Sequence, residues 1–317
     1  MIAIQIENLT KDYPVGFWRK RQVRALDGLN LTVEAGETFG FLGPNGAGKT
    51  TTLKLLMRLI HPTSGHAEIL GRSFTDVSVH QQLGYLPENP FFYDYLTAEE
   101  FLNYSARLFD LPAQSIPSKV TALLDVVGLP AARRLQLRKF SKGMLQRIGI
   151  AQALINDPEV VFLDEPMSGL DPIGRREIRE LILELRRQGK TVFFSSHILP
   201  DVEALCDRVA ILYAGKLLGC GRLDELVPQE TGSMELMVGH FNETLRNELQ
   251  AIGKEISMAG NLLRVTLADQ GALFRAVEAV HRRGAHVIRI LPGKESFEDY
   301  FVKLFAPPGG SARAKPL

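Results

Sequence analysis

A chain of 317 residues, 45% hydrophobic and 23% charged, is long enough for about two globular domains. Its net charge of +1 excludes a whole-molecule attraction to nucleic acid or to an acidic membrane surface. Two cysteines, Cys206 and Cys220, are too few for a disulfide framework and lack metal-ligand spacing, which favours a reducing cytoplasm. No window approaches the roughly 18 uninterrupted apolar residues of a membrane span, so work at a membrane would require a partner.

Residues 1–222 are expected to form one α/β domain. Apolar runs predict strands, the last of them a closing hairpin, at 2–9, 23–33, 37–43, 160–166, 191–197 and 208–221. The segment of about 88–158 has apolar residues at helical spacing, including 96–111 and 118–129, and is expected to be a helical subdomain. A helix over 175–190 separates two continuous apolar runs, which is typical of a parallel sheet buried on both faces.

Residues 223–305 show a different pattern and are expected to form a smaller α+β domain. Strand and helix patterns alternate in the order β-α-β-β-α-β, at 234–240, 243–253, 254–260, 261–268, 271–284 and 286–292. This order predicts a ferredoxin-like fold. A last short helix is expected over 295–305, and the Pro- and Gly-rich tail 306–317 is expected to be disordered.

A phosphate-binding loop is predicted at residues 43–50. They read GPNGAGKT and match the pattern Gly-x-x-x-x-Gly-Lys-Thr between a predicted strand and a predicted helix. Glycine lets the backbone wrap an anion closely, so that N–H groups point at phosphate oxygens. Lys49 would supply a point charge to the terminal phosphates, and Thr50 a hydroxyl suited to Mg²⁺. The alternative is a glycine turn without a ligand, which the flanking strand and helix disfavour.

An acidic pair follows the apolar run 160–166. Asp164 and Glu165 lie at the carboxyl end of a predicted parallel strand, where open α/β sheets place their ligands. A carboxylate there can hold Mg²⁺, directly or through water, because Mg²⁺ prefers oxygen ligands. Its neighbour points differently and could polarise an attacking water. Two ordinary loop charges would look the same, but their combination with a phosphate loop favours a site.

A second helix start suited to an anion lies at 139–147, KFSKGMLQR. Ser141 holds a capping position, where its hydroxyl would satisfy a free backbone N–H, and Gly143 follows. The series GPNGAGKT, FSKGMLQR, VVFLDEP, SGLD at 168–171 and His197, in that order, resembles the ATP-binding cassette (ABC) ATPase family. In that family two cassettes pack head to tail. The phosphate loop of one and the signature helix start of the other then enclose the same ATP.

The resemblance covers about residues 2–221 and implies a role for each motif. Thr50 and Asp164 would handle Mg²⁺, with Glu88 facing the metal or its water. Glu165 would be the general base or the group that orients water, and His197 would sense the γ-phosphate. Tyr13 would stack on adenine, Ser141 and Gly143 would reach the partner's γ-phosphate, and Asp171 belongs to the loop that couples the two sites. The full set of implied ATP contacts is Tyr13, Gly43, Asn45, Gly46, Ala47, Gly48, Lys49, Thr50, Thr51, Ser141, Gly143 and Asp171.

The chain departs from the family pattern at two places. The signature, usually Leu-Ser-Gly-Gly-Gln, reads FSKGM at 140–144. Lys142 therefore adds a positive charge near the partner's nucleotide, and Met144 lacks an amide that could reach its ribose. Glu88 stands where the family usually has glutamine, so a charge replaces a neutral amide there.

Two segments are candidates for contact with a membrane protein. The aromatic residues Phe91, Phe92, Tyr93 and Tyr95 lie where the family grips a short helix of a membrane subunit, and about half of them are expected to pack internally instead. The basic stretch 15–24, VGFWRKRQVR, is typical of a solvated hairpin tip. The alternative is that it approaches anionic headgroups or the cytosolic end of the membrane subunit.

The C-terminal domain resembles the extension of some exporter-type cassettes that pair with separate membrane subunits. The sequence thus predicts an ATP-hydrolysing subunit of an ABC exporter, with ATP and Mg²⁺ as cofactors and no nucleic-acid partner. It would form a homodimer, or a pair with another cassette, and dock peripherally on permease subunits at the cytoplasmic face of the membrane. Two alternatives are a soluble non-transport ABC ATPase, disfavoured by the single cassette, and a regulatory module that binds ATP without turnover, disfavoured by Glu165 and His197.

Overall fold

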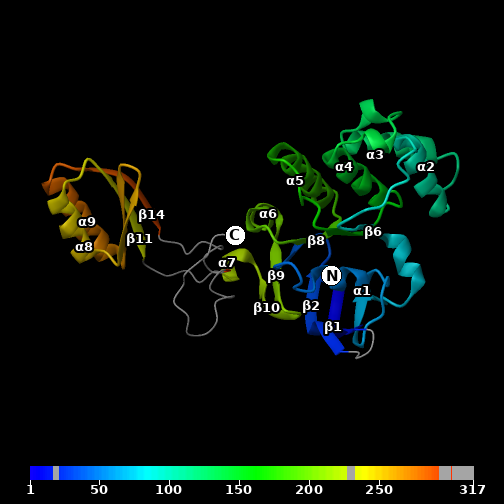
Figure 1. Ribbon diagram of the computed structural model, residues 1–317, viewed down its shortest axis with the longest axis horizontal. Coiled ribbons are helices and arrows are strands. Elements are labelled where there is room, and N and C mark those ends of the chain that lie inside the picture. The colour runs from blue at the N-terminus through cyan, green and yellow to red at the C-terminus, as the bar shows by residue number, and fades with distance from the viewer. Residues whose placement is uncertain (17–20, 227–232, 293–300, 302–317) are drawn as a thin grey trace. The chain divides into compact units, whose positions relative to one another are not determined.

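The computed structural model describes residues 1–16, 21–226, 233–292 and Phe301. The chain divides into two compact units, Met1–Leu226 and Val227–Leu317, and Figure 1 labels many of their elements. The centre of the predicted basic stretch, the predicted helix over 295–305 apart from Phe301, and the predicted tail lie outside the described residues.

A six-stranded sheet forms the centre of the first unit, in the order β10-β9-β3-β8-β7-β6. Its strands are β3 (Thr38–Leu42), β6 (Leu83–Leu86), β7 (Val160–Asp164), β8 (Thr191–Ser196), β9 (Arg208–Tyr213) and β10 (Lys216–Gly221). All neighbours are parallel except the hairpin β9–β10. Every residue of β3, β7 and β8 is buried, as the unbroken apolar runs predicted.

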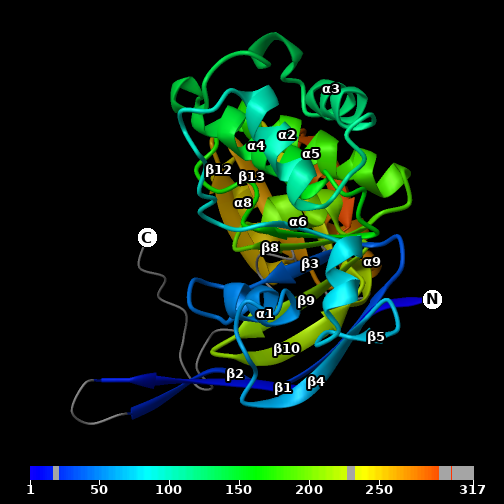
Figure 2. The ribbon, with the colours of Figure 1, turned by 90° about the vertical axis from the view of Figure 1, so that its right-hand side faces the viewer.

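A second, antiparallel sheet has the order β2-β1-β4-β5. It consists of β1 (Ile2–Val15), β2 (Arg21–Glu34), β4 (Ser64–Ile69) and β5 (Arg72–Ser73). The ends of β1 and β2 extend as a ribbon away from the rest of the unit (Figure 2). β4 was not predicted because SGHAEI carries only two buried side chains, too few for a clear alternating pattern.

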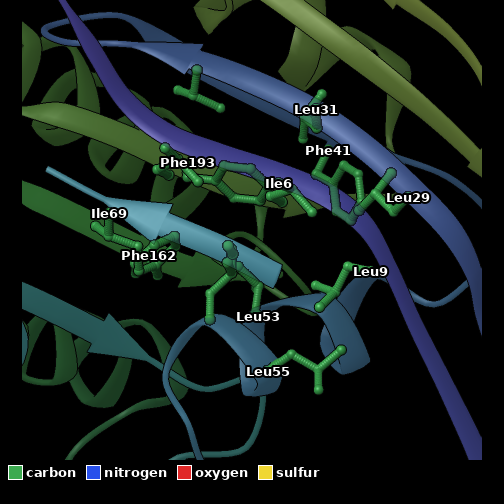
Figure 3. Packing of buried hydrophobic residues seen from close by; sticks show 14 of the residues in the cluster. Ile6, Leu9, Leu29, Leu31, Phe41, Leu53, Leu55, Ile69, Phe162 and Phe193 are labelled. Carbon is green, nitrogen blue, oxygen red and sulfur yellow. The ribbon is translucent and has the colours of Figure 1, made fainter. Parts of the chain in front are cut away.

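The hydrophobic core of the unit lies between these sheets and α1 (Lys49–Leu56) (Figure 3). Phe193 of β8 lies among three other rings of the central sheet. The centroids of Phe39, Phe41 and Phe162 are 5.4, 5.3 and 5.7 Å from its own. This aromatic packing joins β3, β7 and β8, so the carboxyl ends of the three strands are held in fixed relative positions.

Fewer residues of the first unit are helical than the sequence predicted. The expected helical subdomain contains α2 (Ala98–Leu108), α3 (Ile116–Val126) and α4 (Lys142–Ala153), joined by turns and short 3₁₀ segments. The remaining helices are α5 (Pro172–Arg187), α6 (Leu199–Leu205) and α7 (Leu223–Leu226). α5 begins three residues before its predicted start, because Asp171 caps it and Pro172 takes its first position. No helix in the described part of the chain has both the length and the apolar character for a membrane crossing.

The second unit has the predicted ferredoxin-like order. Its elements are β11 (Met234–Gly239), α8 (Glu243–Ile252), β12 (Glu255–Ala259), β13 (Leu262–Leu267), α9 (Gln270–Arg282) and β14 (His286–Pro292). The strands form one antiparallel sheet in the order β12-β13-β11-β14. Alternate residues of β11 and β13 pack against the apolar faces of α8 and α9, which gives this unit a core of its own.

Candidate nucleotide-binding site

The loop between β3 and α1 takes a backbone path that requires glycine. Gly46 and Gly48 have φ angles of 80° and 110°, a region that residues with a Cβ rarely adopt. A Cβ on Gly43 would lie 2.3 Å from the carbonyl oxygen of Leu212, and one on Gly48 would lie 2.6 Å from that of Ala25. The glycines of the predicted phosphate loop therefore permit both its curvature and its close packing.

A cavity of about 370 Å³ opens over this loop. It is lined by Ala25, Asn45, Gly46, Ala47, Gly48, Lys49, Thr50, Thr51, Glu88 and Glu165. The structure thus brings most of the predicted phosphate loop together with two predicted carboxylates. Ala25 of β2 was not predicted, since an alanine in a strand gives no sequence signal. Gly43 is not in the lining, and its carbonyl oxygen accepts a hydrogen bond of 2.7 Å from the Lys49 ammonium.

Glu165 lies between the side chains of Lys49 and His197 at the end of β7. Its Oε1 is 3.1 Å from Lys49 Nζ, and its Oε2 is 2.8 Å from His197 Nδ1. The Lys49 and Glu165 side chains are only 6% and 7% exposed, so their ion pair is shielded from water. Glu165 has φ 49°, an unfavourable angle for a residue with a Cβ that tends to occur at functional sites. The predicted catalytic pair, Glu165 and His197, is therefore in direct contact.

Asp164 is fully buried and has an asymmetric set of partners. Its Oδ1 accepts hydrogen bonds from Thr50 Oγ1 at 3.2 Å and from Ser195 Oγ at 2.6 Å. Its Oδ2 is buried and has no hydrogen-bond partner among the described residues. Burial raises the pKa of the Asp164 carboxyl, and the bonds from Ser195 and Thr50 oppose this shift. Ser195 was missed, because only the register of β7 and β8 reveals its contact with Asp164.

Besides Gly43, four more predicted ATP contacts do not line the cavity of their own chain. Ser141 caps α4 as predicted, accepting a 3.3 Å hydrogen bond from Met144 N, and Gly143 is in the first turn. Asp171 caps α5. Tyr13 lies within β1, with the Lys11 ammonium 5.1 Å from its ring centroid. These four residues therefore lie away from the phosphate loop of their own chain, and Ser141 and Asp171 cap the helices in which they stand.

The fold and the site define a P-loop nucleoside triphosphatase: a glycine loop enters a helix, and an acidic pair lies at the end of another parallel strand of the same sheet. Residues 26–168 match the ABC transporter family model. The chain is 46% identical to an uncharacterized ABC transporter ATP-binding protein of Synechocystis sp., over 95% of this chain and 84% of that protein. It is 34% identical to the Nod factor export ATP-binding protein I of Burkholderia lata, over 88% and 91% of the two chains.

The chain therefore belongs to the ABC transporter ATP-binding protein family and is an ATPase of that family. A solved structure agrees with the fold. It is cbiO1 from Clostridium perfringens, part of the ABC transporter complex cbiONQ, with 26% identity and a TM-score of 0.63 over 71% of this chain and 90% of that one. The resemblance inferred from the motifs is confirmed at the level of family, cassette fold and ATP binding.

Lys49→Ala is expected to weaken ATP binding by about 10- to 100-fold, since hydrogen bonds to a charged group contribute about 1.5–3 kcal/mol each. Titration of the purified chain with a fluorescent ATP analogue measures this affinity. Lys54→Ala is the matched control, because Lys54 is an exposed lysine of the same helix. Equal affinities of Lys49→Ala and the native chain would contradict the assignment of the phosphate loop.

Proposed function

We propose that this chain is the ATP-hydrolysing subunit of an exporter, and that two copies close around two molecules of ATP·Mg²⁺. The observation that carries the proposal is the incomplete cavity: it holds the phosphate loop, Glu88 and Glu165, but neither Ser141 nor Gly143. A helix start that suits an anion and lies outside its own chain's site can serve the site of a second copy. The name of the Burkholderia lata relative supports the export direction.

The residues around Asp164 fit a magnesium ion. In the described part of the chain, no group of three or more His, Cys, Asp and Glu side chains could hold a metal. Thr50 and Asp164 offer hard oxygen atoms instead, and the free Oδ2 of Asp164 suits a metal or its water. Both residues would hold Mg²⁺ together with the nucleotide's own oxygens, and Glu88 would face it from the cavity wall. Bound Mg²⁺ neutralises charge on the phosphates.

Phosphate binding and the activation of Glu165 are linked through Lys49. The Lys49 ammonium is paired with Glu165, and phosphate oxygens would compete for the same ammonium. Once released from Lys49, the Glu165 carboxylate can accept a proton from a water aligned with the γ-phosphate. The contact with His197 keeps the carboxylate oriented during this exchange.

A docking surface for a membrane subunit is proposed at the start of the helical subdomain. Phe91, Tyr93 and Tyr95 are 87%, 40% and 59% exposed, whereas Phe92 packs on Phe101 with a centroid distance of 5.3 Å. Exposed aromatic side chains bury large areas on binding at low entropic cost. We therefore place the contact with a permease here, with the cassette on the cytoplasmic face of the membrane.

Glu165→Gln should retain ATP binding, lose hydrolysis by about 10²- to 10⁴-fold and accumulate an ATP-bound dimer, because the amide cannot act as a general base. Phosphate release and light scattering measure the two effects. Glu159→Gln is the control, since Glu159 is exposed and directly precedes the same strand. Glu165→Gln that stays monomeric with ATP would count against the paired cassette.

Ser141→Arg should leave each chain able to bind ATP but reduce turnover by at least about 100-fold, since the bulky side chain would occupy the partner's phosphate site. Mixing it with Lys49→Ala should restore turnover, because a mixed pair holds one pocket with both walls intact. Ser118→Arg is the control on an exposed face of α3. Normal turnover by Ser141→Arg alone would mean that this helix start serves another purpose.

Phe91→Glu should release the chain from membranes of the cells that produce it, while the ATP affinity of the purified chain stays unchanged. A buried carboxylate in the contact would carry a desolvation cost. Co-sedimentation with washed membranes measures the effect. Phe274→Glu, at an aromatic residue of α9 that is 69% exposed, is the control. Equal sedimentation of both variants would remove Phe91 from the docking surface.

A further inference from the structure

One buried hydroxyl contacts both members of the acidic pair. Ser195 of β8 is the register partner of Asp164 in the parallel sheet, and it is fully buried. Its Oγ lies 2.6 Å from Asp164 Oδ1 and 2.9 Å from the backbone nitrogen of Glu165. A single side chain thus touches the carboxylate assigned to the metal and the peptide that leads to the proposed base.

The directions of these hydrogen bonds follow from proton count. The Glu165 N–H can only donate, so the Ser195 oxygen accepts from it, and the one hydroxyl proton is left to donate to Asp164 Oδ1. Thr50 donates to the same Oδ1. Both hydroxyl bonds therefore fall on one carboxylate oxygen, and the other oxygen, Oδ2, has no partner among the described residues.

We propose that Ser195 is a positioning residue for the reaction: it orients the Asp164 carboxylate so that Oδ2 is available to Mg²⁺ or its water. The same hydroxyl fixes the peptide that carries Glu165 at its unfavourable φ of 49°. Ser195 thereby couples the position of the metal to the position of the base. This inference depends on the proposed magnesium-dependent function.

β8 supplies a matched hydroxyl away from the site. Thr191 begins the strand, is 2% exposed and accepts a 2.9 Å hydrogen bond from Gly36 N. Removal of the Ser195 hydroxyl leaves the buried Glu165 N–H without its acceptor, and removal of the Thr191 hydroxyl does the same to the part-buried Gly36 N–H, so both changes should lower folding stability. Only Ser195 also touches Asp164. The pair therefore separates a role toward the metal from a general loss of stability.

The test is the nucleotide affinity of the full chain for a fluorescent ATP analogue, with Mg²⁺ and with EDTA. Ser195→Ala should bind as the native chain does in EDTA but lose about 10- to 100-fold of the Mg²⁺-dependent gain in affinity, as expected when a group that orients a metal ligand is removed. Ser195→Thr should keep most of the gain because it keeps the hydroxyl. Thr191→Val should keep the full gain.

A double-mutant cycle decides whether Ser195 acts through Asp164. In the Asp164→Asn background, Ser195→Ala should cause no further loss of the Mg²⁺-dependent gain. An additive loss, an equal loss in EDTA, or the same loss in Thr191→Val would overturn the inference. If Ser195→Ala does not fold, Ser195→Cys takes its place, with a weaker donor at the same position. A native chain without any Mg²⁺-dependent gain would instead count against the proposed function itself.

Discussion

The parallel alignment of β3, β8 and β7 is the constraint on which the site depends. Leu42 pairs with Ser196, and Ser195 pairs with Asp164, so the three strands end at the same edge of the sheet. The Phe193 ring packs against rings of β3 and β7 and maintains this alignment from within the core. Groups from three distant parts of the chain are thereby held in fixed relative positions by the tightly packed core. The site is thus a consequence of sheet packing as well as of its loops.

The local motifs of the site could be predicted from the sequence, whereas the contacts between them could not. Glycine spacing and flanking elements specify the phosphate loop, and the cap at Ser141 follows from its own neighbours. Ser195 depends on the register of two strands, and Ala25 reaches the cavity from the other sheet. Tyr13, expected to stack on adenine from the resemblance alone, does not line the cavity, and its stacking role stays a prediction.

Buried negative charge makes this edge of the sheet unfavourable until cations are present. Asp164 and Glu165 are adjacent and buried, and burial raises the pKa of Asp164. Burial also raises the pKa of the Tyr85 hydroxyl, with Asp164 and Glu88 adding to the shift through their charge. Lys49 is ion-paired with Glu165, whereas the hydrogen-bond partners of the Asp164 carboxylate among the described residues are the hydroxyls of Thr50 and Ser195. The divalent cation proposed beside Asp164 would offset this buried charge, and it would arrive with the nucleotide.

The signature helix and the loop at 168–171 are in contact within one chain, which bears on how two copies would communicate. A Cβ on Gly169, whose φ is 67°, would collide with the Lys142 ammonium, and Leu170 lies at contact distance from the Cβ position of Gly143. Arg175 of α5 also donates to the Leu170 carbonyl oxygen at 3.2 Å. Any shift of the signature residues at 140–144 toward a partner's nucleotide would therefore displace the loop at 168–171, which follows β7 and its acidic pair. Because that loop is packed from two sides, such a shift would reach the acidic pair through it, and in the proposed pair of copies this would link the state of one pocket to the geometry of the other.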